Sequence, residues 1–259
     1  MSGCDRVGEA PGTAPTPQPA PGGTTTVAST IVVAMDGTSG SGKSSTSRRV
    51  ASRLGLRYLD TGAQFRAVTA AMIDAGVDFA AADVAEQVAA LAARPVVESG
   101  TDPDAPTITV DGHDVAERIR TQEVTDHVSA VASVPQVRQR LLDLQREIIG
   151  AGGIVVEGRD IGSVVAPDAQ VKLYLTADPA ARAARRTAEN GAGDLDATQA
   201  DLLRRDAIDS GRATAPAVAA DGAVHLDTTP YTLEQVVDLV AGLVEQAGAT
   251  SPEGSGRPA

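Results

Sequence analysis

The sequence predicts an α/β fold in which a mostly parallel sheet is flanked by helices. Short apolar runs that are rich in β-branched residues, such as 30–36 and 154–156, have the composition of buried parallel strands. Segments with helical periodicity follow two early runs, for example 45–54 and 63–75. A glycine-rich turn joins the first strand to the first helix. Strands that alternate with helices in this way favour a single parallel sheet.

Length and composition exclude several classes of protein. A chain of 259 residues fits one α/β domain with insertions or two small domains. Its net charge of −12, with no Trp, two Phe and three Tyr, argues against nucleic-acid binding, which needs a basic surface and aromatic stacking platforms. A single cysteine, Cys4, can build neither a disulfide framework nor a zinc site. With no membrane-length apolar run and no signal peptide, a cytoplasmic protein is expected.

Both ends of the chain are predicted to be disordered tails. Residues 1–28 are dominated by Gly, Ala, Pro and Thr, and residues 248–259 have a similar composition. Such segments bury too little apolar area to offset the entropy lost on ordering. The folded domain is therefore expected to span 29–247.

The turn after the first predicted strand contains a complete P-loop pattern. It reads Gly37-Thr38-Ser39-Gly40-Ser41-Gly42-Lys43-Ser44, with Ser45 next in the helix. Glycines let backbone N–H groups approach a polyphosphate, and the helix N-terminus adds its positive dipole end. We expect Lys43 to reach the β- and γ-phosphates and Ser44 to join the shell of Mg²⁺. An ordinary Gly/Ser-rich turn is the alternative.

The periodicity changes at Pro95, which ends a helix. Short strands and a helical pair then follow, at 96–98, 107–110, 113–115, 121–134 and 135–149. Because they separate elements of one βα series, we interpret about 95–145 as an inserted subdomain.

Charged residues follow the strand at 154–156. They stand in Glu157-Gly158-Arg159-Asp160-Ile161-Gly162, at the edge where α/β sheets bind ligands. Charges at this edge are costly unless they meet a ligand or each other. The alternative is a structural ion pair between Arg159 and Asp160.

Arginines cluster again after the strand at 171–175. One helix begins at Asp178-Pro179, and a second arm covers 196–209; together they suggest a lid at about 182–212 with a mobile Gly-rich tip. The lid carries Arg182, Arg185, Arg186, Arg204, Arg205, Asp206, Asp209 and Arg212. Solvated helix charge is the alternative for individual arginines. A strand at 224–227 and a helix from 232 close the domain.

A P-loop alone indicates only a bound nucleoside polyphosphate. GTPases read guanine with an Asn-Lys-x-Asp element, but the one asparagine here, Asn190, has no lysine beside it. Arginine on three separated segments suits phosphoryl transfer to a second anionic substrate, where catalysis is mostly positioning and charge neutralisation.

Taken together, these motifs resemble the cytidylate kinase family of P-loop nucleoside monophosphate kinases. The matching segments are Asp36 to Ser45, Leu59-Asp60-Thr61-Gly62 with Arg66, Ile119 to Val124, Ser129, Pro135-Gln136-Val137-Arg138, Gly158 to Gly162, and Arg205-Asp206 with Asp209 and Arg212. They stand in the family's order between about 30 and 230. The family commonly has an apolar residue and Tyr where this chain has Gln64-Phe65.

The resemblance implies the substrates, the cofactor and the site. It implies transfer of a phosphoryl group from Mg²⁺·ATP to CMP or dCMP, with the ATP site at Gly37 to Ser45. The implied CMP contacts are Arg66, Arg159 and Arg212 on the phosphate, Ser129, Arg138 and Asp160 on cytosine, Arg205 and Asp209 on the ribose, and Thr61 at the monophosphate. Lys43, Arg185 and Arg186 would balance charge on the transferring group. The inserted subdomain would bind the monophosphate.

Two other functions stay open at this point. One is a kinase for another small acceptor, such as UMP, AMP or shikimate. The other is a nucleotide-sensing protein that kept the P-loop and lost transfer, although a sensor has no need of acceptor-side arginines. A monomer that binds neither nucleic acid nor membrane is expected.

Overall fold

The computed structural model describes residues 30–190, 194–211 and 218–250. The predicted N-terminal tail lies outside the described residues, as do Arg212 and most of the C-terminal tail. Helix α8 (Leu233–Thr250) continues past residue 248. The C-terminal tail therefore begins later than the sequence predicts, because the helical backbone runs on after Val244 and Ala247, which pack against the core.

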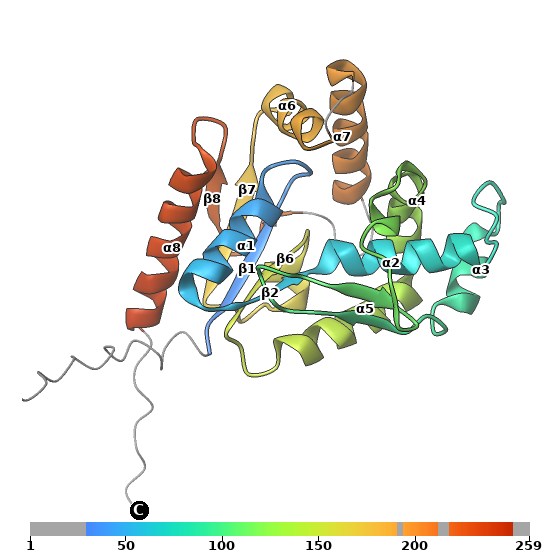
Figure 1. Cartoon of the computed structure of the whole chain (residues 1–259), viewed down its shortest axis with the longest axis horizontal. Helices are drawn as coiled ribbons and strands as arrows, with labels where there is room; N and C mark the ends of the chain where they lie inside the picture. The colour runs from blue at the N-terminus through green and yellow to red at the C-terminus, as the bar shows by residue number, and fades with distance from the viewer. Residues whose placement is uncertain (1–29, 191–193, 212–217, 251–259) are drawn as a thin grey trace, which may run out of the picture.

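A five-stranded sheet forms the centre of the molecule (Figure 1). Its order is β2 (Arg57–Asp60), β6 (Ile154–Glu157), β1 (Val32–Gly37), β7 (Val171–Thr176) and β8 (Val224–Asp227). Every pair of neighbours is parallel. The predicted α/β fold is confirmed. Since β1 lies between β6 and β7, the loop after β1 stands at the centre of the sheet's carboxyl edge, where such sheets bind ligands.

Alternation along β1 separates two cores. Val33 and Met35 face the layer made by α1 (Lys43–Leu54) and α8. Ala34 faces the opposite side, where Ile149 at the end of α5 (Pro135–Ile149) and Ile161 cover the sheet. Because successive side chains of a strand point to opposite faces, an unbroken apolar strand buries both of them.

The inserted segment builds a separate core beside the sheet. Strands β3 (Val97–Ser99), β4 (Ile108–Val110) and β5 (His113–Asp114) form an antiparallel sheet. Helices α2 (Thr61–Asp74), α3 (Val84–Leu91), α4 (Gln122–Ala132) and α5 (Pro135–Ile149) pack with it. Because α2 and α3 share this core, the packed unit begins well before the predicted boundary near residue 95.

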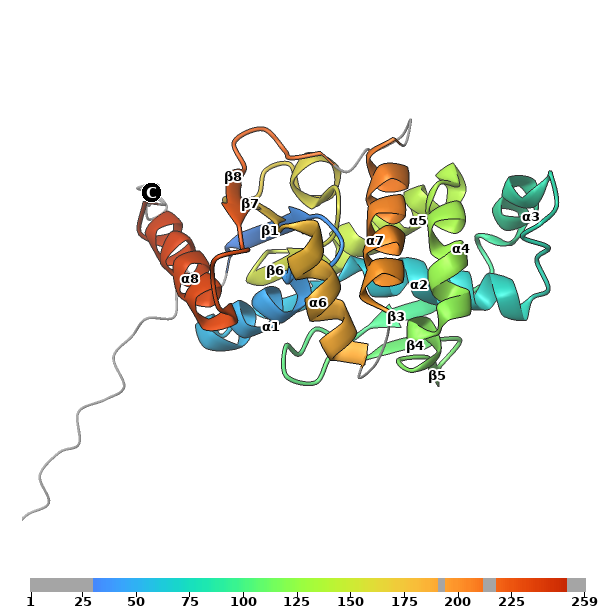
Figure 2. The same cartoon turned by 90° about the horizontal axis from the view of Figure 1, so that it is seen from above.

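Two helices in contact, α6 (Pro179–Asn190) and α7 (Leu195–Ser210), lie over the carboxyl edge of the sheet (Figures 1 and 2). They occupy the segment in which the sequence predicts a lid. Residues 191–193, in the predicted lid tip, lie outside the described residues. The arrangement brings the arginines of α6 and α7 close to the loop after β1.

Candidate active site

The loop between β1 and α1 approaches β7 so closely that its first residue must be glycine. At Gly37, φ is +143°, and an added Cβ would lie 1.9 Å from the carbonyl oxygen of Leu175. Gly42 stands at the N-cap of α1 with φ +89°. L side chains rarely adopt either conformation. The glycines of the predicted P-loop are therefore required by the backbone path.

Lys43 begins α1 and is buried against this loop. Its Nζ donates a hydrogen bond of 2.7 Å to the carbonyl oxygen of Thr38. Burial lowers the pKa of Lys43, and the positive charge of Arg159 lowers it further, whereas Glu157 and Asp36 oppose the shift. A buried ammonium with one carbonyl partner has donors left for an anion, and a bound polyphosphate would stabilise its charged form.

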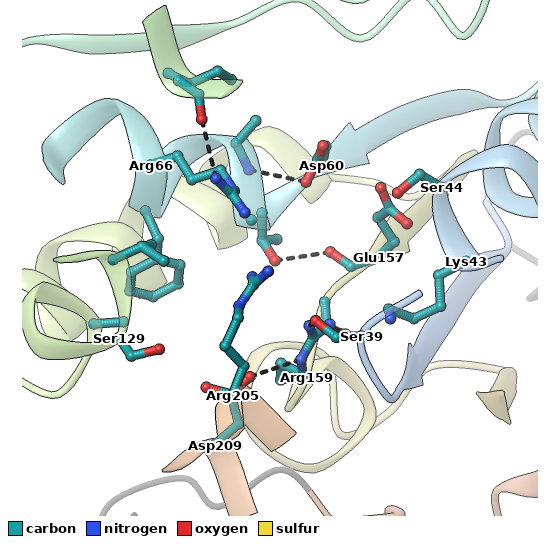
Figure 3. Close-up of a pocket in the computed structure, with 18 of the residues that line it drawn as sticks. Ser39, Lys43, Ser44, Asp60, Arg66, Ser129, Glu157, Arg159, Arg205 and Asp209 are labelled. Atoms are coloured by element: carbon teal, nitrogen blue, oxygen red, sulfur yellow. Dashed lines mark hydrogen bonds and ion pairs between the residues drawn. The ribbon is translucent and has the colours of Figure 1, made fainter. Parts of the chain in front are cut away.

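Two carboxylates stand beside Ser44 at the ends of neighbouring strands. Asp60 and Glu157 are paired residues of β2 and β6 (Figure 3). The Tyr58 hydroxyl donates to Oε1 of Glu157 at 2.6 Å. Oε2 of Glu157 is buried and accepts no hydrogen bond from the described residues. Burial raises the pKa of Glu157, and the charge of Asp60 adds to this shift.

A cavity opens from the loop toward the inserted segment and brings most of the predicted acceptor residues together (Figure 3). Its lining includes Lys43 and Ser44 on one side. The predicted acceptor residues that line it are Thr61, Arg66, Ser129, Arg138, Arg159, Asp160, Arg205 and Asp209. They come from segments that are far apart in the sequence. Arg212 lies outside the described residues.

Arginines dominate the electrostatics of this cavity. Burial, together with the positive charges of Arg205 and Arg186, lowers the pKa of Arg66 to about 10. Its guanidinium donates to neutral acceptors, the carbonyl oxygen of Ile119 at 3.1 Å and the hydroxyl of Thr125 at 3.0 Å. Cations that destabilise one another in this way form a ready site for a phosphate.

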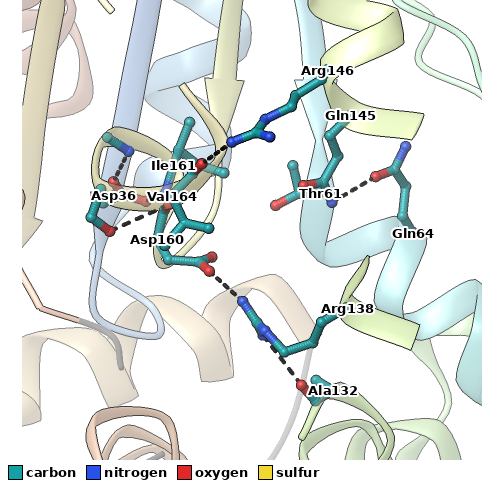
Figure 4. A network of polar contacts seen from close by, with 12 residues as sticks. Asp36, Thr61, Gln64, Ala132, Arg138, Gln145, Arg146, Asp160, Ile161 and Val164 are labelled. Carbon is teal, nitrogen blue, oxygen red and sulfur yellow. Dashed lines mark hydrogen bonds and ion pairs between the residues drawn. The ribbon is translucent and has the colours of Figure 1, made fainter. Parts of the chain in front are cut away.

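Arg159 and Asp160 do not pair with each other. Arg159 donates from Nε to Asp209 of α7 at 3.0 Å. Asp160 pairs instead with Arg138, whose guanidinium also donates to Ala132 and lies 5.6 Å from the centre of the Phe65 ring (Figure 4). The alternative of a local Arg159–Asp160 ion pair is wrong, because the two side chains have partners on different elements.

The lid arginines differ in what they contact. Arg182 is buried, pairs with Asp206 and donates to the phosphate loop. Arg185 donates to the hydroxyl of Thr228 at 2.9 Å and to its carbonyl at 2.8 Å. It lines a second cavity, which also contains Ser45. Arg186 lines both cavities. Arg185 and Arg186 thus lie beside the loop, and their role in charge balance stays a prediction.

Arg204 fits the alternative of solvated helix charge. It is exposed and pairs with Asp201 on the same helix. Exposed pairs of this kind contribute little to stability.

Comparisons with known proteins agree with this geometry. The family described as cytidylate kinase matches residues 33–246. A relative from Streptomyces griseus, named cytidylate kinase, is 58% identical over 85% of this chain and 95% of its own length. Relatives of the same name from Nocardia farcinica and Limosilactobacillus fermentum are 49% and 42% identical; the alignments cover 85% and 83% of this chain and 96% of each relative. The chain belongs to the cytidylate kinase family.

Membership of the cytidylate kinase family confirms the predicted phosphotransferase activity, which is transfer of the γ-phosphoryl group of ATP to CMP or dCMP. In the part of the chain that the structure describes, no helix has the length and apolarity needed to cross a membrane.

The pair that departs from the common cytidylate kinase pattern has partners in the fold. Gln64 is fully buried, and its side-chain oxygen accepts from Nε2 of Gln145 at 3.0 Å (Figure 4). Its own Nε2 donates to the Ser99 hydroxyl at 3.1 Å. Phe65 lines the cavity and carries the Arg138 guanidinium over its ring. The Gln64 amide therefore stands where the family commonly has an apolar residue, and both its oxygen and its nitrogen are hydrogen-bonded.

Sequence reasoning missed several residues of the site. Asp60, Glu157 and Gly158 line the main cavity, but the sequence predicted no role in the site for any of them. Glu157 carried a usable signal, since a charged residue that ends an apolar strand next to β1 must lie at the ligand-binding edge. Asp206 stood in the Arg205-Asp206 motif, but no role was predicted for it. Thr228 carried no signal, because its contact with the carbonyl oxygen of Ser41 arises only from the packing of the segment after β8.

Proposed function

We propose that ATP and CMP bind at opposite ends of the main cavity, with their reacting phosphates between Lys43 and Arg159. The observation that carries this proposal is that the phosphate loop and the acceptor arginines open into the same space. Residues Gly37 to Ser45 would hold the phosphates of ATP. The phosphate of CMP would take Arg66 and Arg159, with Thr61 beside it, and Arg212 would join from the segment after α7.

The base and the sugar of CMP would lie against the inserted segment and α7. Asp160 is proposed to accept from the 4-amino group of cytosine, which uracil lacks. Arg138 pairs with Asp160, Ser129 also lines the cavity, and both are proposed to complete base recognition. Arg205 and Asp209 of α7 are proposed to bind the ribose. Uracil carries an acceptor oxygen where cytosine carries the amino group, so the carboxylate would lose this donor and face a second acceptor, and this penalty gives selectivity.

Phosphoryl transfer is proposed to be direct and in line, from ATP to the oxygen of the CMP phosphate, without a covalent enzyme intermediate. The protein then contributes positioning and charge neutralisation. The buried ammonium of Lys43 is proposed to balance the negative charge of the transferring phosphoryl group. Arg185 and Arg186 stand over the same loop and are proposed to assist it.

The donor set beside the loop fits Mg²⁺. The Ser44 hydroxyl and the carboxylates of Asp60 and Glu157 are hard oxygen donors, and Oε2 of Glu157 is buried without a hydrogen-bond partner among the described residues. We propose that these three residues hold the ion or its water shell. When bound, Mg²⁺ neutralises phosphate charge. Tyr58 orients Glu157 through its hydrogen bond to Oε1.

The Mg²⁺ assignment is tested by titrating free Mg²⁺ at saturating ATP and CMP. Glu157→Gln should raise the concentration for half-maximal rate by about tenfold, as expected for loss of a charged ligand contact. Glu98→Gln is the matched control, because Glu98 is an exposed residue of β3 that contacts Thr109. An unchanged Mg²⁺ requirement in Glu157→Gln would remove this residue from the metal site.

The proposed acceptor site is tested by ADP release from Mg²⁺·ATP with CMP, dCMP, UMP, AMP, GMP or shikimate in separate reactions, and with no acceptor. Strong turnover with CMP and dCMP alone is expected. Turnover with another acceptor would keep the phosphate loop and discard the base contacts. No turnover from folded protein that binds ATP would favour the nucleotide sensor. The cytoplasmic location and the monomeric state stay predictions. Gel filtration with light scattering tests the monomeric state.

A further inference from the structure

Ser39 of the phosphate loop is held at each of its three polar atoms by a charged side chain. Its backbone N–H donates to Oδ1 of Asp206 at 2.9 Å. Its carbonyl oxygen accepts from Arg182 at 2.9 Å, and its hydroxyl accepts from Arg159 at 2.9 Å. Ser39 is itself only 4% exposed. Charge-assisted hydrogen bonds in a buried setting are strong, so these contacts fix the position of Ser39 in an otherwise glycine-rich loop. We call Ser39 with Arg159, Arg182 and Asp206 the joint.

The three partners of Ser39 belong to different parts of the enzyme. Arg182 and Asp206 come from α6 and α7, and they also pair with each other. Arg159 follows β6 and lies in the acceptor half of the cavity, where it also pairs with Asp209 (Figure 3). The joint therefore connects the phosphate loop, the lid and the acceptor site through direct contacts.

In the proposed complex the phosphate loop contacts ATP, and Arg159 contacts the acceptor phosphate. A phosphate that binds Arg159 fixes its guanidinium, and the same guanidinium holds the Ser39 hydroxyl. Ordering of the loop before ATP arrives lowers the entropy that ATP binding must overcome. Binding coupling is reciprocal, so ATP on the loop would favour the acceptor to the same extent.

We propose that Ser39 couples the two substrate sites, its hydroxyl transmitting acceptor binding at Arg159 to the phosphate loop and to the lid. Ser39 acts here as a positioning residue. The inference rests on the proposed placement of the CMP phosphate at Arg159. It goes beyond the transfer reaction because it assigns the cooperation between the substrates to one side-chain contact.

The test is calorimetric binding of Mg²⁺ and a non-hydrolysable ATP analogue, with and without saturating CMP. The coupling ratio is the Kd without CMP divided by the Kd with CMP. Wild-type enzyme should give a ratio well above one. Ser39→Ala removes only the Arg159 contact, since both backbone contacts remain, and should lower the ratio by about tenfold, or to one if the wild-type ratio is smaller.

Ser41→Ala is the matched control for this variant. Ser41 lies in the same loop and is fully buried, but its hydroxyl has no hydrogen-bond partner among the described residues. Its coupling ratio should equal that of the wild type. An unchanged ratio in Ser39→Ala, or equal losses in both serine variants, would overturn the proposal.

The lid side of the joint is tested independently with Asp206→Asn. This change keeps the shape of the side chain but removes its charge, which weakens its hydrogen bond to Ser39 and its contact with Arg182. The coupling ratio should therefore fall again. Asp201→Asn changes an aspartate of the same helix that pairs with Arg204, and its ratio should stay at the wild-type value. Equal weakening of the ATP analogue with and without CMP in Asp206→Asn would overturn the lid's part in the coupling.

The outcomes separate this inference from the proposed function. If CMP fails to bind the wild-type enzyme, the proposed acceptor site is wrong. If CMP and the ATP analogue both bind and the wild-type ratio is one, the acceptor site stands and only the coupling proposal fails.

Discussion

Replacement of Asp160 by asparagine tests the proposed basis of cytosine recognition. In the native site the carboxylate pairs with Arg138, and the two side chains are 9% and 12% exposed. A hydrogen bond to a charged group contributes about 1.5–3 kcal/mol, which corresponds to about a 10- to 150-fold change in kcat/KM. Asparagine also offers an amide donor that the 4-oxo group of uracil can accept. We therefore expect the CMP/UMP ratio of kcat/KM to fall by about tenfold or more.

The fold should survive the Asp160→Asn change. Asparagine keeps one acceptor oxygen for Arg138, whose guanidinium also donates to the carbonyl oxygen of Ala132 at 3.2 Å. The loss of stability should be about 1–2 kcal/mol, less than the 3–5 kcal/mol expected for removing one partner of a buried pair. Thermal unfolding measures this loss.

The assay is steady-state turnover with CMP and with UMP at saturating Mg²⁺·ATP. Asp143→Asn is the control, because Asp143 is an exposed aspartate on the helix that carries Arg138 and accepts a hydrogen bond from Gln139. A folded Asp160→Asn enzyme with the wild-type CMP/UMP ratio would refute the assignment of base recognition to this carboxylate.

Three further predictions concern the loop, pH and the buried amides. Lys43→Ala should lower kcat by about 100-fold or more with an unchanged circular dichroism spectrum, since it removes charge stabilisation from the transferring group; a near-native rate would exclude Lys43 from the mechanism. Because burial and Asp60 raise the pKa of Glu157, its metal-binding carboxylate form is lost as pH falls, from a higher pH than for an ordinary glutamate. The kcat/KM for Mg²⁺·ATP should therefore fall toward acid pH, and Glu157→Gln should flatten this limb; an unchanged acid limb in that variant would assign it to another group. Gln145→Ala leaves the buried oxygen of Gln64 without its donor, so urea unfolding should show a loss of about 1–3 kcal/mol, whereas a loss no larger than that of the exposed Gln139→Ala would contradict this role.

Most of the central sheet and the phosphate loop could be predicted from the sequence because their determinants are local. The run at 30–36 and the glycines at 37 and 42 define a buried strand, a close approach and a helix start within a short stretch of chain. The acceptor residues followed from the family resemblance, and the cavity brings together those that the structure describes. The first helix was predicted from residue 45, but it begins at Lys43.

Contacts between distant segments could not be obtained in this way. The sequence places Arg159 beside Asp160, yet Arg159 pairs with Asp209 and Asp160 pairs with Arg138. Both residues lie in the bend after β6, where their partners come from α7 and α5, so adjacency along the chain does not decide the ion pair. The inserted unit likewise includes α2 and α3, because burial of their apolar faces extends the core beyond the change in periodicity.

The sequence by itself determined that this protein has a P-loop, a parallel sheet and the cytidylate kinase motifs, since each depends on residue order over a few positions. Only the tertiary structure decided that Asp60 and Glu157 meet beside Ser44, and that Arg182, Asp206 and Arg159 converge on Ser39. Strand register and helix packing determine these contacts. They join residues more than 90 positions apart, such as the carbonyl of Glu157 and the hydroxyl of Thr61. The physical reason is that long-range pairing depends on the summed packing of whole elements, which no local pattern records.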